Sequence, residues 1–339
     1  MDPLTQATLG AAAAATICRS PETRHAIVIG ALAAAAPDLD VMIRSDTDPL
    51  LVLEYHRHFT HSIFIAPFIG FIVAALYKVL FLRKLWPFRR LLLFAVVATL
   101  THGLLDSCTS YGTLLYWPFH GHRESWDIIS IIDPIFTLPL VIFTVLSFVF
   151  RRPRFARIAI LLCVTYLCLG LYQRSQAHRY AQTLAATRGH HVERISVRPS
   201  FGNIALWRLL YRSDETYYVD ALRTLPFAKD VLYPGSKVIA FTDEPVREEL
   251  LFESPQDQDV ERFRFFSQGY LYHLYEKPYI IGDLRYSMFP DSIQPIWGIR
   301  LNPNQPNKHV SFEYFRETDT PHLARLFSMI QGKKVSPVD

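Results

Sequence analysis

The apolar residues of this chain are concentrated in long, nearly uncharged runs that all lie before about residue 175. A helix needs about 20 such residues to cross the ~30 Å hydrocarbon core of a membrane, where no water hydrates charged groups or free backbone amides. Four runs approach this length, at residues 62–82, 91–105, 128–150 and 157–172. We therefore expect four membrane helices, and this expectation restricts the fold more than any other feature.

Two shorter, alanine-rich runs precede them, at residues 4–18 and 26–36. Runs of this length could be buried core helices, re-entrant segments or tightly packed spans, because small side chains let helices approach closely. We favour a packed helical hairpin. The fold class expected for residues 1–175 is thus an α-helical polytopic membrane domain of about six helical segments. No basic stretch precedes the first run, so a cleavable signal peptide is not expected.

Basic residues in the short loops predict the orientation, since cytoplasmic loops carry an excess of Lys and Arg. The two richest loops contain Arg83, Lys84, Arg89 and Arg90, and Arg151, Arg152, Arg154 and Arg157. Placing both loops inside also puts Arg19 and Arg24 inside. Residues 37–61, residues 107–127 and everything after about residue 173 then lie on the outer side. These loops also explain most of the net charge of +4 at pH 7, so nucleic-acid binding is not indicated.

Residues 176–339 have a different pattern of short alternating segments, separated by Pro, Gly, Asn and Asp, which is typical of β-strands. The expected strands are 192–197, 205–212, 216–221, 237–241, 262–266, 270–275, 279–284, 296–301 and 310–315, with a helix at 322–331. We expect a β-rich extramembrane domain without a nucleophile elbow, P-loop or dinucleotide fingerprint. It could cover the outer mouth of the membrane domain, select a substrate, or only stabilise the helices.

Histidine and aspartate residues recur where the apolar runs break. Seven stand at these breaks: Asp38, Asp40, His56, His58, His61, His102 and Asp106. Ionisable groups at the edge of the hydrocarbon are costly, so a cluster of them indicates a functional site. The predicted topology places all seven on the outer side of the membrane, where they could meet in one site.

A metal ion would explain this set of residue types. His102 and Asp106 are four residues apart in a helical run, so one helix face could offer a nitrogen and an oxygen to one cation, although such pairs also form simple hydrogen bonds. Asp38 and Asp40 stand at the C-terminal end of a helix, where the helix dipole disfavours anions, although Asx-turns are an alternative. Mixed nitrogen and oxygen ligands suit Zn²⁺ first, with Mn²⁺ or Fe as alternatives. The candidate ligands are Asp38, Asp40, His56, His61, His102 and Asp106.

Several further residues could join the site. His58 could share a helical face with His61, and His120 and His122 flank Gly121 in the second outer loop. Asp127 and Asp133 stand at the entrance of the fifth apolar run. Asp133, followed by a proline, also fits an ordinary helix start with an aspartate N-cap. The participation of His58, His120, Asp127 and Asp133 therefore stays open.

An ordered set of motifs carries a family resemblance. The motifs are residues 1–6 (MDPLTQ) with Gly10, residues 37–40 (PDLD), 56–62 (HRHFTHS), 102–106 (HGLLD), Thr109, 111–113 (YGT), 117–119 (WPF) and 133–139 (DPIFTLP). Together they resemble the YdjM-type inner-membrane metal-dependent hydrolases. Residues 266–270 and 283–286 resemble the C-terminal extension of longer members. Gln6 stands where many members have His, and His58 where many have Gly, so His58 could be an extra or substitute ligand.

The resemblance implies a multi-pass protein of the bacterial inner (plasma) membrane with a metal centre, distantly similar to zinc-dependent phospholipase C and P1 nuclease. Combined with the loop charges, it predicts that the metal site and the C-terminal domain are extracytoplasmic. The expected partners are membrane lipids and a small-molecule or lipid phosphoester substrate.

We expect a hydrolase in which the metal lowers the pKa of water toward ~7 and Asp40 accepts its proton as general base. Asp40 and His56 are the candidate catalytic residues. One alternative is a lipid phosphatase with a histidine nucleophile, for which the outer loops offer only Arg44, Arg57 and Arg123 to hold phosphate. Another is a non-enzymatic membrane scaffold whose metal has no open coordination position.

Overall fold

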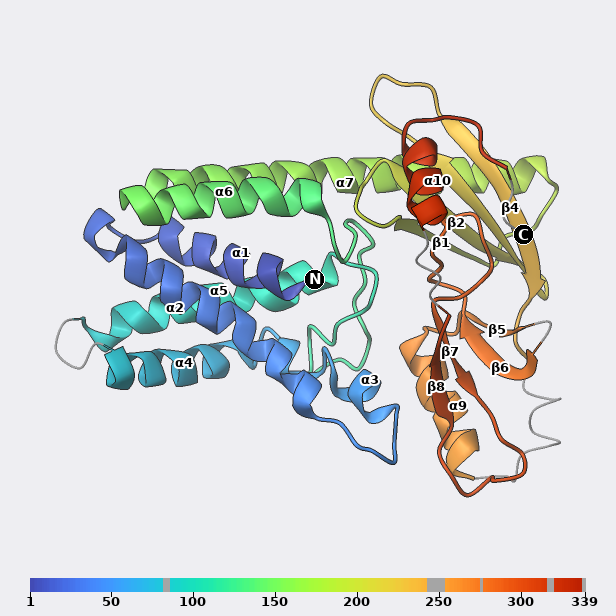
Figure 1. The fold of residues 1–339 in the computed structure, drawn as a ribbon, viewed down its shortest axis with the longest axis horizontal. Coiled ribbons are helices and arrows are strands. Elements are labelled where there is room, and N and C mark those ends of the chain that lie inside the picture. Colours follow the sequence, from blue (N-terminus) through green and yellow to red (C-terminus); the bar gives the residue numbers. More distant parts are fainter. Residues whose placement is uncertain (82–85, 243–253, 275–276, 316–319, 337–339) are drawn as a thin grey trace. The chain divides into compact units, whose positions relative to one another are not determined.

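The chain forms two compact units in a computed structural model (Figure 1). The structure describes residues 1–81, 86–242, 254–274, 277–315 and 320–336. Unit 1 comprises residues 1–43, 55–171 and 201–203, and unit 2 comprises residues 44–54, 172–200 and 204–339. Unit 2 therefore includes a short stretch from the N-terminal part of the chain. Arg83 and Lys84, two of the basic residues used to orient the helices, lie outside the described residues.

Unit 1 is helical. Its elements are α1 (Pro3–Thr16), η1 (Ser20–Glu22), α2 (Thr23–Ala35), η2 (Ala36–Met42), η3 (Phe59–His61), α4 (Ala66–Phe81), α5 (Phe88–Ser107), α6 (Pro134–Phe150) and the first part of α7 (Pro153–Thr187), where η marks a 3-10 helix. Asp2 caps helix α1, because its side chain accepts the Thr5 N–H. Helices α1 and α2 form the expected packed hairpin (Figure 1). Gly10 lies at their crossing, because a Cβ there would come within 2.2 Å of the Ala34 Cβ.

Three helices in the described residues are long and apolar enough to cross a membrane: Ser20–Met42, Phe88–Ser107 and Pro153–Thr187. A fourth candidate is the pair Leu51–His61 and Ala66–Phe81, which is bent by 80°. The N-terminal part is thus a helical domain with three to four candidate spans, and six segments stay a prediction. The runs expected from residues 62 and 128 become regular α-helix only at Ala66 and Pro134.

Unit 2 contains two four-stranded antiparallel sheets, in the orders β1-β2-β3-β4 and β5-β6-β7-β8 (Figure 1). The strands are β1 (Arg194–Pro199), β2 (Leu206–Ser213), β3 (Thr216–Arg223), β4 (Val231–Ile239), β5 (Leu271–Leu274), β6 (Lys277–Asp283), β7 (Trp297–Arg300) and β8 (Ser311–Tyr314). The helices are α3 (Leu51–Tyr55), α9 (Pro255–Phe266), α10 (Thr320–Ile330) and the end of α7. The expected β-rich domain is therefore present. Tyr275, the end of one expected strand, lies outside the described residues.

The strand expected at residues 262–266 is wrong, because these residues belong to α9. Ser254 caps this helix by accepting the Asp257 N–H, and Pro255 is its first residue. The alternation of Arg and Phe imitates a strand, but Phe263 and Phe266 are buried whereas Phe265 is exposed. Burial at a spacing of three residues is helical periodicity.

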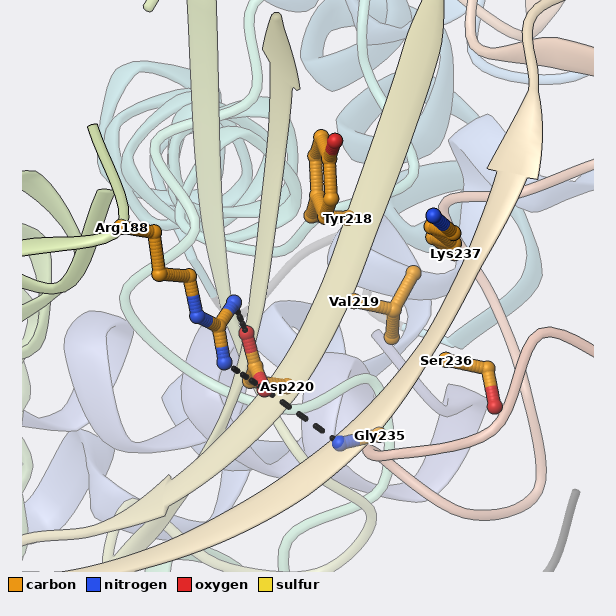
Figure 2. A pocket seen from close by; sticks show the side chains of 7 residues that line it. All are labelled: Arg188, Tyr218, Val219, Asp220, Gly235, Ser236 and Lys237. Carbon is orange, nitrogen blue, oxygen red and sulfur yellow. Dashed lines mark hydrogen bonds and ion pairs between the residues drawn. The ribbon is translucent and has the colours of Figure 1, made fainter. Parts of the chain in front are cut away.

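A hollow of about 510 Å³ lies over β3 and β4 and is lined by residues that include Tyr218 and Lys237 (Figure 2). On its floor, the Arg188 guanidinium donates to both carboxylate oxygens of Asp220, at 2.6 and 2.9 Å. The Gly235 N–H also donates to Asp220. These bonds engage both carboxylate oxygens, so we interpret the pair as the attachment of the end of α7 to the first sheet.

Candidate metal centre

Helix α5 and the 3-10 helices η2 and η3 bring most of the predicted ligands together in unit 1. Asp38 and Asp40 lie on η2, His61 ends η3, and His102 lies on α5. The absence of a side chain at Gly103 allows η3 to lie against α5, because a Cβ there would come within 2.1 Å of the His61 carbonyl oxygen. Small-residue packing thus places His61 beside His102.

In their neutral forms, the two histidine rings would present nitrogen lone pairs to each other. His102 Nδ1 lies 2.5 Å from the Ala34 carbonyl oxygen, which can only accept, so this nitrogen carries the proton in the neutral ring. His61 Nδ1 lies 3.2 Å from Asp40 Oδ2 and donates to it. The two Nε2 atoms then face each other at 2.9 Å. Two lone pairs at this distance repel unless a cation, either a proton on one ring or a metal ion, lies between them.

The donor atoms around these nitrogens have the spacing of a metal site. Asp38 Oδ1 lies 3.4 Å from each Nε2 atom. Ligands about 2.0–2.2 Å from a tetrahedral Zn²⁺ are about 3.3–3.6 Å apart. Both distances from Asp38 match this spacing, whereas the two Nε2 atoms, 2.9 Å apart, would have to separate slightly around such an ion. Asp106 Oδ2 is 3.3 Å from His61 Nε2 and 3.9 Å from His102 Nε2, as the i,i+4 spacing predicted.

Asp40 orients two of the histidines. Its Oδ1 accepts from His56 Nδ1 at 2.8 Å, and its Oδ2 accepts from His61, the Arg57 N–H and the Thr60 hydroxyl. A carboxylate that fixes the rings of metal-binding histidines is a common outer-shell arrangement. Asp38, Asp40 and His56 also form a second, overlapping group that could hold an ion.

Buried charges around Asp106 were missed by sequence reasoning. Arg57 Nε lies 3.0 Å from Asp106 Oδ2, and the Met1 amine pairs with Oδ1. The Arg57 guanidinium also donates to Thr109 and packs over the Tyr111 ring. Arg57 lies within the motif 56–62, so its position was visible, but its inward direction depends on a left-handed backbone (φ 63°) that the sequence does not signal. Asp106 pairs with both of these cations, whereas Asp38 and Asp40 pair with the histidines.

Gln6 provides a second indication of a cation. Its amide nitrogen donates to Asp106 Oδ1 at 2.7 Å and to the His102 carbonyl oxygen at 3.2 Å. Because both partners only accept, the amide orientation is fixed. This orientation leaves Gln6 Oε1 buried without a hydrogen-bond partner in the part of the chain that the structure describes. A buried unsatisfied acceptor costs about 1–3 kcal/mol, so this oxygen is available to a cation bound beside Asp106. The residues present therefore fit a divalent metal.

The residues left open by the sequence lie outside these groups. Asp133 caps α6 by accepting the Ile135 and Phe136 N–H groups and the Tyr166 hydroxyl, as the helix-start interpretation predicted. His120 and His122 are exposed. His58 Nδ1 accepts the Phe59 N–H. Asp127, which is buried, also lies in neither group.

Comparison with known proteins identifies the family. Residues 1–177, which contain every predicted ligand, match the model of the YdjM inner membrane protein family. This chain belongs to the YdjM family. The uncharacterized protein YfhP of Bacillus subtilis strain 168 is 25% identical over 276 residues, which cover 78% of this chain and 79% of YfhP. No solved structure matches.

YdjM membership confirms the resemblance inferred from the motifs and makes the chain a member of an inner membrane protein family with apolar helices. The similarity to YfhP spans more residues than the family match, so it extends into unit 2. The distant similarity to zinc-dependent phospholipase C and P1 nuclease stays a prediction.

Proposed function

We propose that the protein is a membrane-bound, metal-dependent hydrolase that acts on a phosphoester, with a lipid-like molecule as the preferred substrate. The facing Nε2 atoms of His61 and His102, with Asp38 Oδ1 at 3.4 Å from both, are the observation that carries this proposal. Asp106 is the fourth donor, and Gln6 Oε1 adds a further neutral oxygen. Zn²⁺ is the first choice, and Mn²⁺ or Fe are alternatives.

When bound, the cation would supply Lewis-acid polarisation of a phosphoryl oxygen and lower the pKa of water. The residues around it supply the rest of the chemistry. His56 donates through Nδ1 to Asp40, which leaves its Nε2 able to accept a proton. The His56 side chain is 22% exposed, whereas that of Asp40 is fully buried. We therefore assign His56 as general base and Asp40 as the carboxylate that orients it, in place of Asp40 as the base.

Exposed apolar side chains beside the site support a lipid-like substrate. On η2, Leu39 is 63% and Met42 is 74% exposed, although Asp40 in the same segment is buried. Phe119, 78% exposed, packs edge-on against Phe64 with 4.9 Å between ring centroids. Carboxylates next to exposed apolar groups suit a molecule with a polar headgroup and an apolar chain. Membrane lipids are the proposed partners.

The topology belongs to the same proposal. We infer six segments in a multi-pass arrangement, with the metal site and the β-rich domain on the extracytoplasmic side. The basic residues at 151–157, where α6 ends and α7 begins, and the family's inner-membrane description support this orientation. The phosphohistidine alternative is less favoured, because Arg57 is committed to Asp106 and Thr109, and Arg123 donates to backbone carbonyls.

The test is a substrate screen with metal-loaded protein in lipid nanodiscs. Water-soluble phosphomonoesters and phosphodiesters are compared with long-chain lipid phosphoesters of the same headgroup. We expect hydrolysis of a lipid phosphoester that falls about 100-fold or more in His56→Gln, while the metal is retained, and is unchanged in His122→Gln. Full metal occupancy without hydrolysis of any substrate class would refute the proposal and favour the scaffold alternative.

A further inference from the structure

Residues 44–54 connect two parts of the metal centre but belong to unit 2. The residues on either side, up to 43 and from 55, belong to unit 1. On one side, residue 44 follows η2 closely, and η2 carries Asp38 and Asp40. On the other side, residue 54 is followed within two residues by His56. The positions of η2 and of His56 therefore depend on how this segment, which we call the strap, is held.

A single guanidinium holds the middle and the C-terminal end of the strap. Arg262 on α9 pairs with the two carboxylate oxygens of Asp48 at 3.0 and 2.9 Å. Its Nε donates to Glu54 Oε2 at 3.0 Å. The bidentate contact is the strong form of an arginine–carboxylate pair. Asp48 also accepts the Leu50 N–H, and Leu50 is buried. The strap is thus fixed by charge at its middle and at its end, with the buried Leu50 between them.

Arg262 is in turn fixed by the body of unit 2. Its Nη1 donates to Asp259 Oδ1 at 2.9 Å, one turn earlier on α9. The other oxygen of Asp259 accepts the Val310 N–H at 3.0 Å and faces His309 Nδ1 at 2.9 Å. Asp259 is fully buried. The guanidinium therefore has a set orientation before it receives Asp48 and Glu54.

We propose that Arg262 is a positioning residue for the metal centre. The stretch from Asp40 to His56 is a loop closed at its base by the 2.8 Å hydrogen bond between these two side chains. Arg262 restrains the middle of this loop, which lowers the entropy lost when its two ends meet. Unit 2 would then pre-organise the arm of the site that carries Asp40 and His56. The inference rests on the proposed metal centre for its purpose, but the restraint itself can be measured without metal.

The first experiment is hydrogen–deuterium exchange of the full-length protein in detergent. The Arg57 N–H, which donates to Asp40, is the amide that reports the closed arm. In Arg262→Met, we expect exchange of peptides covering 36–43 and 55–61 to accelerate about tenfold, and Arg262→Lys to fall between that variant and wild type. Arg300→Met is the matched control, because it removes an exposed ion pair with Glu313 elsewhere in unit 2. Unchanged exchange in β2 and β3 would show that unit 2 stays folded.

The second measurement is Co²⁺ affinity and the visible spectrum of the Co²⁺ complex. Arg262→Met should weaken binding about tenfold, but should have less than a twofold effect in a His56→Ala background. Faster exchange confined to residues 44–54, with exchange at 36–43 and 55–61 unchanged, would overturn the inference. If wild type binds no metal, the proposed function fails, and the exchange data still decide whether Arg262 restrains the arm.

Discussion

Substitution of Asp40 by Asn distinguishes two roles for this residue, a carboxylate that orients the histidines and a direct metal ligand. Asparagine keeps the size of the side chain but removes the charge that both oxygens present to His56 and His61. Its amide nitrogen cannot accept, so at least one ring must rotate, change its protonated nitrogen or lose its partner. Loss of an outer-shell partner of this kind costs about 10–100-fold in metal affinity, or roughly 1.4–2.7 kcal/mol. We expect Asp40→Asn to bind metal in this weakened range with unchanged stoichiometry.

The assay is competition for Zn²⁺ against a chromogenic chelator, with protein purified in detergent. Asp46→Asn is the control, since Asp46 is exposed in the strap and belongs to none of the groups of described residues that could hold a metal. Wild-type affinity in Asp40→Asn would refute the claim that Asp40 holds the histidine rings. Complete loss of binding would instead show that Asp40 is itself a ligand.

Three further predictions follow from the packing, the strap and the metal. Gly103→Ala should displace His61, abolish metal binding and lower the thermal unfolding midpoint by the equivalent of about 1–3 kcal/mol. Gly121→Ala, where a Cβ meets nothing within 4 Å, should leave metal binding and the midpoint unchanged. Metal titration and calorimetry of the two variants test this. Although burial raises the pKa of Asp48, hydrogen bonds from Arg262 hold it below the ordinary value of 3.8. The stability from this pair is fully present above pH 3.8 and is lost as the pH falls below it, so thermal midpoints of wild type and Asp48→Asn should converge on acidification, and a constant difference would contradict the assignment. Chelator treatment should lower the midpoint, because a ligand at 100 times its Kd stabilises a protein by about 2.7 kcal/mol, and an equal effect on His102→Ala would exclude this site as the cause.

Much of the helical part could be predicted because membrane helices have a strong hydropathy signal. The spacing of His102 and Asp106 within an apolar run also predicts, from the sequence alone, that both lie on one helix face. The β-rich part was harder, since short strands and helices share local patterns. The alternation of Arg and Phe at residues 262–266 suggested a strand, whereas tertiary burial of Phe263 and Phe266 and the Ser254 cap produce a helix.

Other parts of the site depend on contacts that a single sequence does not show. The approach of His61 to His102 requires Gly103. The sequence shows this glycine but does not show that it lies against the His61 carbonyl group. Gln6 was not expected to bind a metal, because it stands where many members of the family have His. Its orphaned oxygen becomes visible only when Asp106 and the His102 carbonyl fix its amide. The membership of residues 44–54 in unit 2 depends on ion pairs over more than 200 positions in sequence, which no local pattern signals.

Elemental analysis of the purified protein tests the central claim most directly. Wild type, His102→Ala and His122→Ala are incubated with Zn²⁺, Mn²⁺ or Fe²⁺, desalted and compared for metal per chain. We expect wild type and His122→Ala to retain at least one divalent ion per chain and His102→Ala to retain none, with all three monodisperse. Wild type without stoichiometric metal, or His102→Ala with the wild-type content, would contradict the account.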